Sequence, residues 1–231
     1  MRELIRRLPL VKSVVLEVRT VLGRPFFPGS VKFWESRYRK GNTSGGGSYG
    51  RLAQFKAQTL NSFVADNGIT SVIEFGCGDG HQLTLARYPR YVGLDVSRTA
   101  IHLCKERFKN DRTKSFYLYE SSCFVDNLHL FTADLAISLD VVYHLVEDEV
   151  YTAYMSHIFD AARKFVIVYS SDGTERCPSL YIRHRPFTSW VASHRPEWSL
   201  VEKIDNPYPY DGIDSDTTSW SDFFVFNRQS P

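Results

Sequence analysis

Apolar residues along the chain follow two spacings, which predict alternating strands and helices. Short apolar runs predict strands at residues 71–75, 91–95, 115–119, 134–139 and 164–169. Apolar residues at helical spacing predict helices at residues 51–67, 80–87, 98–108 and 147–162. Strands separated by such helices pair in parallel through right-handed crossovers. The pattern therefore predicts an α/β fold, a doubly wound and mostly parallel sheet with helices on both faces.

The last third of the chain departs from this alternation. Residues 198–204 and 221–227 both predict strands, and no helical pattern separates them. Strands without a crossover helix between them pair in antiparallel fashion. We therefore expect a seven-stranded sheet with an antiparallel C-terminal strand.

The first 50 residues have a different character. Residues 1–23 carry apolar residues at helical spacing beside five basic ones, which predicts an amphipathic helix. Such a helix either covers the domain or contacts an anionic membrane surface or a partner. Its charges exclude a transmembrane span and a signal peptide. Residues 40–50, KGNTSGGGSYG, predict a flexible loop.

Composition narrows the classes of function. Hydrophobic residues make up 43% and charged residues 23% of the chain, as in ordinary globular proteins. A net charge of +2 without a basic block gives no general attraction to nucleic acid, so we expect no nucleic-acid partner. Cys77, Cys104, Cys123 and Cys177 form no CxxC pair and no metal-ligand spacing. We expect reduced thiols, no metal and a cytoplasmic location, with peripheral membrane attachment as an option.

The first predicted strand ends in a glycine-rich turn, VIEFGCGDG at residues 72–80. Glycines at the carboxyl end of such a strand let the backbone approach a nucleotide-like ligand. Their G-x-G-x-G spacing departs from the G-x-G-x-x-G of dinucleotide sites, which disfavours a nicotinamide-dependent reductase. Glu74 would repel a pyrophosphate and attract an ammonium or sulfonium group. Asp95 ends the second strand, where a carboxylate accepts hydrogen bonds from ribose. These features indicate S-adenosylmethionine.

This turn and YVGLDVS at residues 91–97 together resemble the first two signature motifs of class I S-adenosylmethionine-dependent methyltransferases. The resemblance covers at least half of the chain. It implies that Asp95 holds the ribose and Val96 packs on the adenine. Ser122 stands where members often place an aspartate near the adenine amine, with Glu120 as an alternative. The residues implied to line the methionine part of the donor are Glu74, Gly76, Cys77 and Gly78.

The same resemblance extends to ADLAISLDVVYHL at residues 133–145 and to the N-terminal glycine-rich segment. It implies that Asp140 lies near the donor, with Tyr143 and His144 as further catalytic candidates. Asp140 can instead cap a helix, and His144 is either structural or the general base. Residues 33–50 resemble a lid that closes over the cofactor with Tyr38 and Tyr49, although a plain surface loop is the alternative.

The acceptor side depends on YIRHRPFTSW, residues 181–190. In an extended stretch Arg183 and Arg185 face the same side and can clamp a phosphate or carboxylate beside His184. A solvated basic loop is the alternative. We expect O-methylation of a small polar or anionic acceptor such as a saccharide or phosphorylated sugar. Nitrogen and thiol acceptors stay open, as does a non-catalytic cofactor-binding module that docks through the basic N-terminus.

Overall fold

The protein is described by a computed structural model covering residues 27–177 and 179–229. Within these residues seven strands form one sheet in the order β3-β2-β1-β4-β5-β7-β6. The first five strands are parallel, whereas β7 is antiparallel to both of its neighbours. This confirms the predicted sheet. The strands are β1 (Val72–Phe75), β2 (Tyr91–Asp95), β3 (Lys114–Leu118), β4 (Ala133–Leu139), β5 (Ala162–Ser170), β6 (Trp198–Ile204) and β7 (Asp222–Arg228).

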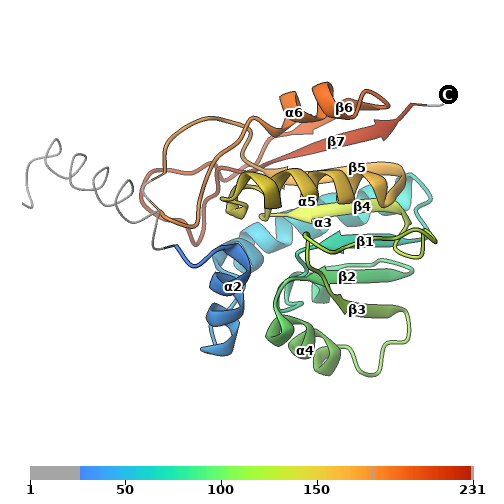
Figure 1. Ribbon diagram of the computed structural model, residues 1–231, viewed down its shortest axis with the longest axis horizontal. Helices are drawn as coiled ribbons and strands as arrows, with labels where there is room; N and C mark the ends of the chain where they lie inside the picture. The colour runs from blue at the N-terminus through green and yellow to red at the C-terminus, as the bar shows by residue number, and fades with distance from the viewer. Residues whose placement is uncertain (1–26, 178, 230–231) are drawn as a thin grey trace, which may run out of the picture.

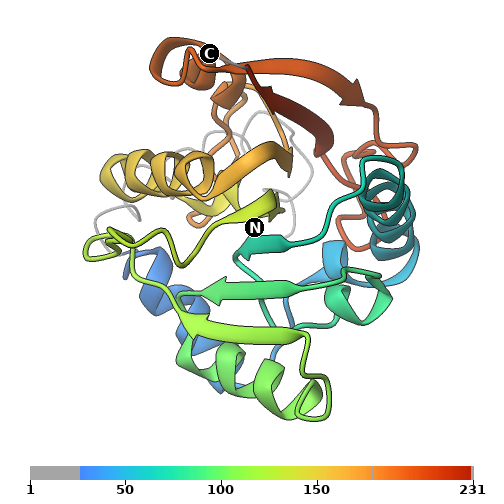
Figure 2. The same ribbon diagram turned by 90° about the vertical axis from the view of Figure 1, so that its right-hand side faces the viewer.

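The sheet is covered by helices on both faces, and this explains its continuous apolar strands. All seven residues of β4 are buried, because alternate side chains enter opposite layers of the core. Ala136 packs in the layer beneath α5 and α6, and Ile137 packs in the layer beneath α3 and α4. Figure 2 shows α3 and α5 on opposite sides of the sheet. These helices are α3 (Gly50–Asp66), α4 (Arg98–Arg107), α5 (Asp148–Asp160) and α6 (Phe187–His194).

Two segments differ from the sequence-based expectation. The helix expected at residues 80–87 is a short 3-10 helix, η4 (Gln82–Leu85). Pro89 lies just before β2 and disfavours a longer helix, because proline lacks a backbone donor and restricts the residue before it. No helix was predicted at α2 (Ser30–Arg39), whose sequence SVKFWESRYR is polar on average. A further 3-10 turn, η3 (Gly46–Ser48), lies in the predicted loop.

The N-terminal elements lie where the central parallel strands end. Figure 1 shows α2 beside the end of the sheet at which the arrow of β4 terminates. The amphipathic helix predicted for residues 1–23 lies outside the described residues, and the division of the chain at residue 50 stays a prediction. In the described part, no helix is both long and apolar enough to cross a membrane.

Candidate cofactor site

A cavity lies at the carboxyl ends of β1, β2 and β4, and α2 and the residues that follow it contribute to its wall. Nucleotide-like ligands bind at this position in open α/β sheets. The structure brings most of the predicted site residues together here. Those that line the cavity are Tyr38, Glu74, Gly76, Cys77, Gly78, Asp95, Val96, Asp140 and His144.

The glycine turn is shaped by close packing on both sides. Gly76 and Gly78 have φ angles of +86° and +57°, in the left-handed region that favours glycine. A Cβ atom on Gly76 would collide with Val141, and one on Gly78 would collide with Ser44. The backbone amides of Gly76 and Cys77 both donate to the carbonyl of Leu94, at 2.7 and 3.0 Å. The turn is therefore fastened to β2 and leaves its backbone close to the cavity.

Asp95 connects the glycine turn to the start of α4. Its Oδ2 accepts a hydrogen bond from the amide of Gly78 at 2.9 Å, and its Oδ1 accepts one from the amide of Ser97 at 2.8 Å. Burial raises the pKa of Asp95 to about 6, although these two amide donors oppose the shift. At pH 7 the carboxylate is mostly ionised and keeps acceptor capacity for a ligand hydroxyl.

Glu74 is more deeply perturbed. Burial raises its pKa to about 7, and the hydroxyl of Tyr91 donates to Oε2 at 2.5 Å. Glu74 is therefore about half protonated at neutral pH. From the sequence, a permanent negative charge was expected at this position. A bound cation would favour the ionised form, so ligand binding and loss of this proton are linked.

Lys56, which was not singled out from the sequence, forms a buried ion pair with Asp140. Its Nζ lies 2.6 Å from Oδ2, and only 1% of the lysine side chain is exposed. Tyr143 and Ser221 donate from their hydroxyls to Oδ1 of Asp140, at 3.2 and 2.9 Å. The carboxylate of Asp140 therefore accepts hydrogen bonds from three side chains at the cavity wall. It provides no side-chain cap for η5 (Val142–His144), the short helix that follows it.

Lys56 has a recognisable signal in the sequence. It lies midway between Leu52 and Leu60 at i, i+4 and i+8, on the buried face of α3. A lysine there must find a partner, because burying an unpaired charge is costly. Among the described residues that line the cavity, it is the sole lysine or arginine.

His144 is held as a neutral imidazole in the cavity wall. Its Nδ1 lies 2.8 Å from the carbonyl oxygen of Tyr181, and burial lowers its pKa to about 4. A carbonyl only accepts, so the proton resides on Nδ1 and Nε2 keeps its lone pair. The indole of Trp34 meets the ring edge to face at 4.9 Å.

The loop at residues 40–49, here called the lid, is fastened to the glycine turn by Asp79. The amide of Ser44 and the hydroxyl of Tyr49 donate to Oδ2 of Asp79, at 3.0 and 3.1 Å. The amide of Asp79 in turn donates to Oγ of Ser44 at 3.0 Å, and that oxygen also lies 3.0 Å from the hydroxyl of Tyr38. The loop at residues 40–49 therefore packs against the glycine turn. Asp79 was overlooked in the sequence although it stands between two motif glycines.

Three predicted cofactor or catalytic residues do not line the cavity. Tyr49 stacks on His81 at 3.9 Å and reaches Asp79 instead. Ser122 is exposed and donates to Glu120, while its neighbour Ser121 lines the cavity. Tyr143 does not reach the cavity and contacts it only through Asp140, to which its hydroxyl donates.

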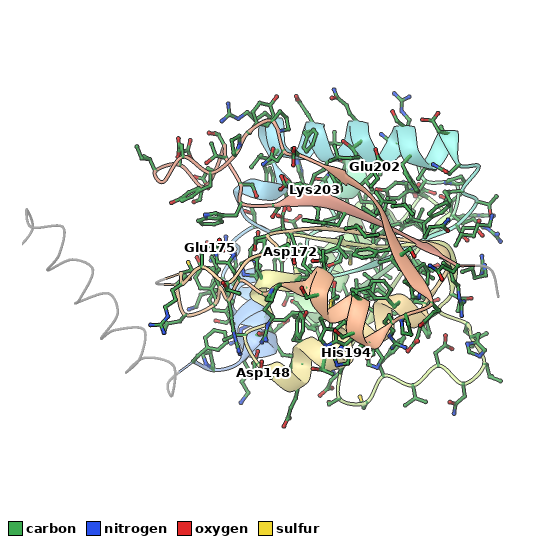
Figure 3. All side chains as sticks on the ribbon, turned by 90° about the horizontal axis from the view of Figure 1, so that it is seen from above. Asp148, Asp172, Glu175, His194, Glu202 and Lys203 are labelled. Carbon is green, nitrogen blue, oxygen red and sulfur yellow. The ribbon has the colours of Figure 1, made fainter. Side chains whose placement is uncertain are left out.

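The predicted acceptor residues also lie outside the cavity. Arg183 and Arg185 both contact Oδ1 of Asp148, at 2.9 and 2.6 Å, and Arg185 also donates to the backbone carbonyls of residues 145 and 146. The Nδ1 of His184 lies 2.6 Å from Oγ of Ser171. Figure 3 labels Asp148, which anchors both guanidinium groups. Because these groups already have acceptors, the structure does not arrange them as an anion clamp.

No three His, Cys, Asp or Glu side chains of the described chain gather closely enough to hold a metal ion. The cavity offers other ligand chemistry. Oε1 of Gln82 is buried and finds no hydrogen-bond donor among the described residues, while its amide nitrogen donates to the carbonyl of Ala53. Gln82 lines the cavity, so this acceptor is available to a ligand donor.

Comparison with known proteins agrees with this geometry. Residues 47–209 match the family model described as a methyltransferase domain. The methyltransferase domain of bacterial CtHen1 is 20% identical with a TM-score of 0.61, covering 78% of this chain and all of that one. The N-methyltransferase NodS from Bradyrhizobium japonicum, in complex with S-adenosylhomocysteine, is 15% identical with a TM-score of 0.59, covering 78% and 88%. No curated protein matches the sequence significantly.

A third similar structure corrects one expectation. The small RNA methyltransferase HEN1 is 16% identical with a TM-score of 0.57, covering 80% of this chain and 26% of that one. Because proteins of this fold include an enzyme named for RNA, the exclusion of a nucleic-acid partner from net charge was wrong. A near-neutral total does not prevent a local concentration of basic residues.

Proposed function

The chain belongs to the methyltransferase-domain family, whose members use S-adenosylmethionine, and we propose that it methylates a hydroxyl oxygen of a sugar-type acceptor. The observation that carries this proposal is His144, a half-buried neutral imidazole with an unprotonated Nε2 in the cavity wall. A hydroxyl nucleophile must lose a proton, and a positioned imidazole can accept it.

The residues of the cavity fit the cofactor. Asp95 would accept hydrogen bonds from ribose hydroxyls, and the bare glycine turn would let the nucleoside approach. The unpartnered Oε1 of Gln82 would accept from the ammonium group of the methionine part. When bound, S-adenosylmethionine supplies an electrophilic methyl group on a sulfonium sulfur.

The chain's own residues then have three tasks. The closed lid and α2 exclude water and align the acceptor, which matters because displacement at carbon requires an in-line approach. His144 takes the hydroxyl proton at Nε2 as the new oxygen–carbon bond forms. The electron pair of the broken sulfur–carbon bond stays on sulfur. Asp140 lies close enough to favour the protonated imidazole.

The experiment compares His144→Gln with His184→Gln, a matched change outside the cavity. Purified protein is incubated with isotopically labelled donor and free sugars, sugar phosphates or oligonucleotides, and methylated products are identified by mass spectrometry. We expect His144→Gln to slow turnover about 10²-fold. Donor affinity, measured by calorimetry, should stay unchanged, and His184→Gln should retain activity.

Two outcomes would contradict the proposal. Normal turnover of His144→Gln would remove the general base, and a methyl group found on nitrogen or sulfur would remove the hydroxyl acceptor. Donor binding without transfer to any acceptor class would instead support a non-catalytic module.

A further inference from the structure

A second concave surface adjoins the cofactor cavity. It lies between α2 and the start of α4, and Val31 and Val96 line both the cavity and this groove. We call it the basic groove because its lining includes five cationic side chains. These are Lys32, Arg37, Arg39, Lys40 and Arg98.

The positive charge of the basic groove is not neutralised by ion pairs with the described residues. Within residues 27–177 and 179–229, none of the five cations forms an ion pair with a carboxylate. Glu35 is the acidic residue among those lining the groove, and its carboxylate accepts from the hydroxyls of Ser97 and Thr99 at 2.6 and 2.8 Å. Arg37 is partly committed, because it donates to the carbonyl of Thr43. Four cations stay available.

The arrangement of these cations fits several phosphates better than one. Lys32 and Arg39 stand at i and i+7 on α2 and therefore share one side of the helix, and Lys40 follows as its C-cap residue. Seven residues of helix rise about 10 Å, which is too far for one phosphate to contact both ends. Arg98 adds a cation from the start of α4.

We propose that the basic groove binds the phosphate backbone of a single-stranded nucleic acid, so that a nucleotide next to the bound phosphates enters the cavity as the acceptor. This inference rests on the proposed function, since a ribose hydroxyl is a sugar hydroxyl. A concave surface with polar Ser36 and Asn42 suits a strand better than a flat membrane face. Val31 lines both the groove and the cavity, and its apolar side chain suits a nucleobase.

Binding is tested without donor, so that it does not depend on catalysis. A fluorescent single-stranded RNA is titrated with the full chain, and its anisotropy is followed at 50 and 200 mM salt. With four phosphate contacts the salt slope is about −2.8, so affinity should fall about 50-fold across this range. A salt-independent affinity would contradict the proposal.

Two charge-matched triple variants locate the binding surface. One carries Lys32→Glu, Arg39→Glu and Lys40→Glu, and the control carries Arg90→Glu, Lys105→Glu and Arg112→Glu at exposed positions outside the groove. We expect at least tenfold weaker RNA binding by the groove variant and less than threefold by the control. Unchanged melting temperatures and donor affinities show that both variants are folded.

The outcomes separate this inference from the proposed function. Equal losses in both triple variants, or binding to phosphatidylserine vesicles but not to RNA, would overturn the basic groove as a nucleic-acid site. Methyl transfer to a free sugar by a protein that does not bind RNA would overturn the groove and leave the proposed function standing. RNA binding by the wild-type protein and by His144→Gln, without methyl transfer by the wild-type protein to any acceptor, would overturn the proposed function. It would leave the basic groove standing as a nucleic-acid site.

Discussion

At the scale of single residues, two buried carboxyl groups at the glycine turn behave differently from surface acids. Glu74 and Asp95 are 4% and 6% exposed, and burial raises the pKa of both. Asp95 is compensated by two backbone amides, whereas Glu74 has one tyrosine hydroxyl. The unfolded chain, in which both carboxyls are hydrated, therefore holds their protons less tightly than the folded protein does.

Glu74→Gln tests this shift through stability. The carboxyl has a pKa of about 7 when folded and 4.5 as its ordinary value, so it stabilises the folded protein below pH 4.5. That contribution is lost as the pH rises through 7, at a cost of about 3 kcal/mol. Glutamine does not ionise and can still accept from Tyr91. Relative to the variant, the wild type should therefore lose stability between pH 4.5 and 8 in urea unfolding.

The control for this measurement is Glu202→Gln, an exposed position on β6 labelled in Figure 3. Its difference from the wild type should stay constant over the same pH range. If the Glu74→Gln difference is equally constant, the buried carboxyl has an ordinary pKa.

At this scale, the sequence predicted residues with strong local signals. Asp95 ends an apolar strand at the right distance from the glycine turn, and the structure places it in the cavity wall. Lys56 was missed because helical periodicity assigns its position to the core, where a lysine is an exception. Its partner Asp140 is 84 residues away, and a pairing over that distance depends on the topology of the sheet.

At the scale of elements, the lid and the glycine turn form one hydrogen-bonded unit. Asp79 accepts from Ser44 and Tyr49 of the lid, and also from the amide of His81 within its own turn. Two glycines also allow close packing between the lid and its neighbours. A Cβ atom on Gly47 would lie 2.8 Å from Oδ2 of Asp140, and one on Gly78 would strike Ser44. Closure thus requires glycine on both sides.

Asp79→Ala should release the lid. The variant loses two lid hydrogen bonds, each worth about 1–3 kcal/mol when a charged acceptor is involved, whereas Tyr49→Phe loses one. Hydrogen exchange should accelerate at residues 41–49 in Asp79→Ala, less so in Tyr49→Phe, with no change in α5. Protection from hydrogen exchange equal to that of the wild type in both variants would show that the hydrogen bonds to Asp79 do not hold the lid in place.

Elements with strong periodicity were predicted well, and those defined by long-range contacts were not. The strands β2 and β6 have the predicted bounds, because their apolar runs end at turn residues. The helix α2 was missed since it is polar and half exposed, and its order derives from contacts with distant segments. Ser30 donates to the carboxylate of Glu147, and Glu35 accepts from Ser97 and Thr99.

At the scale of the whole molecule, segments from both ends of the described chain meet at the cavity or at Asp140 in its wall. Ser221, which precedes β7, contacts Asp140 after β4, while α2 and the lid cover the same region. A ligand bound there contacts the folded protein and loses those contacts on unfolding. Its binding free energy therefore adds to the stability of the whole chain.

The donor should raise the melting temperature in proportion to its occupancy. At a hundredfold excess over Kd the gain is about 2.7 kcal/mol, which corresponds to roughly 5–10 °C for a domain of this size. Differential scanning fluorimetry with S-adenosylmethionine, S-adenosylhomocysteine and NAD provides the measurement. The first two ligands should shift the transition and NAD should not. An equal shift with NAD would contradict the cofactor assignment.

The hydrogen bonds between Asp79 and the lid also have a consequence for the order of binding and release in a catalytic cycle. The donor would reach its seat only while the lid is open, and the demethylated product would leave by the same route. An acceptor bound along α2 would keep the lid closed. Steady-state kinetics should therefore show an ordered mechanism, in which S-adenosylmethionine binds first and S-adenosylhomocysteine is released last. Excess acceptor should inhibit turnover.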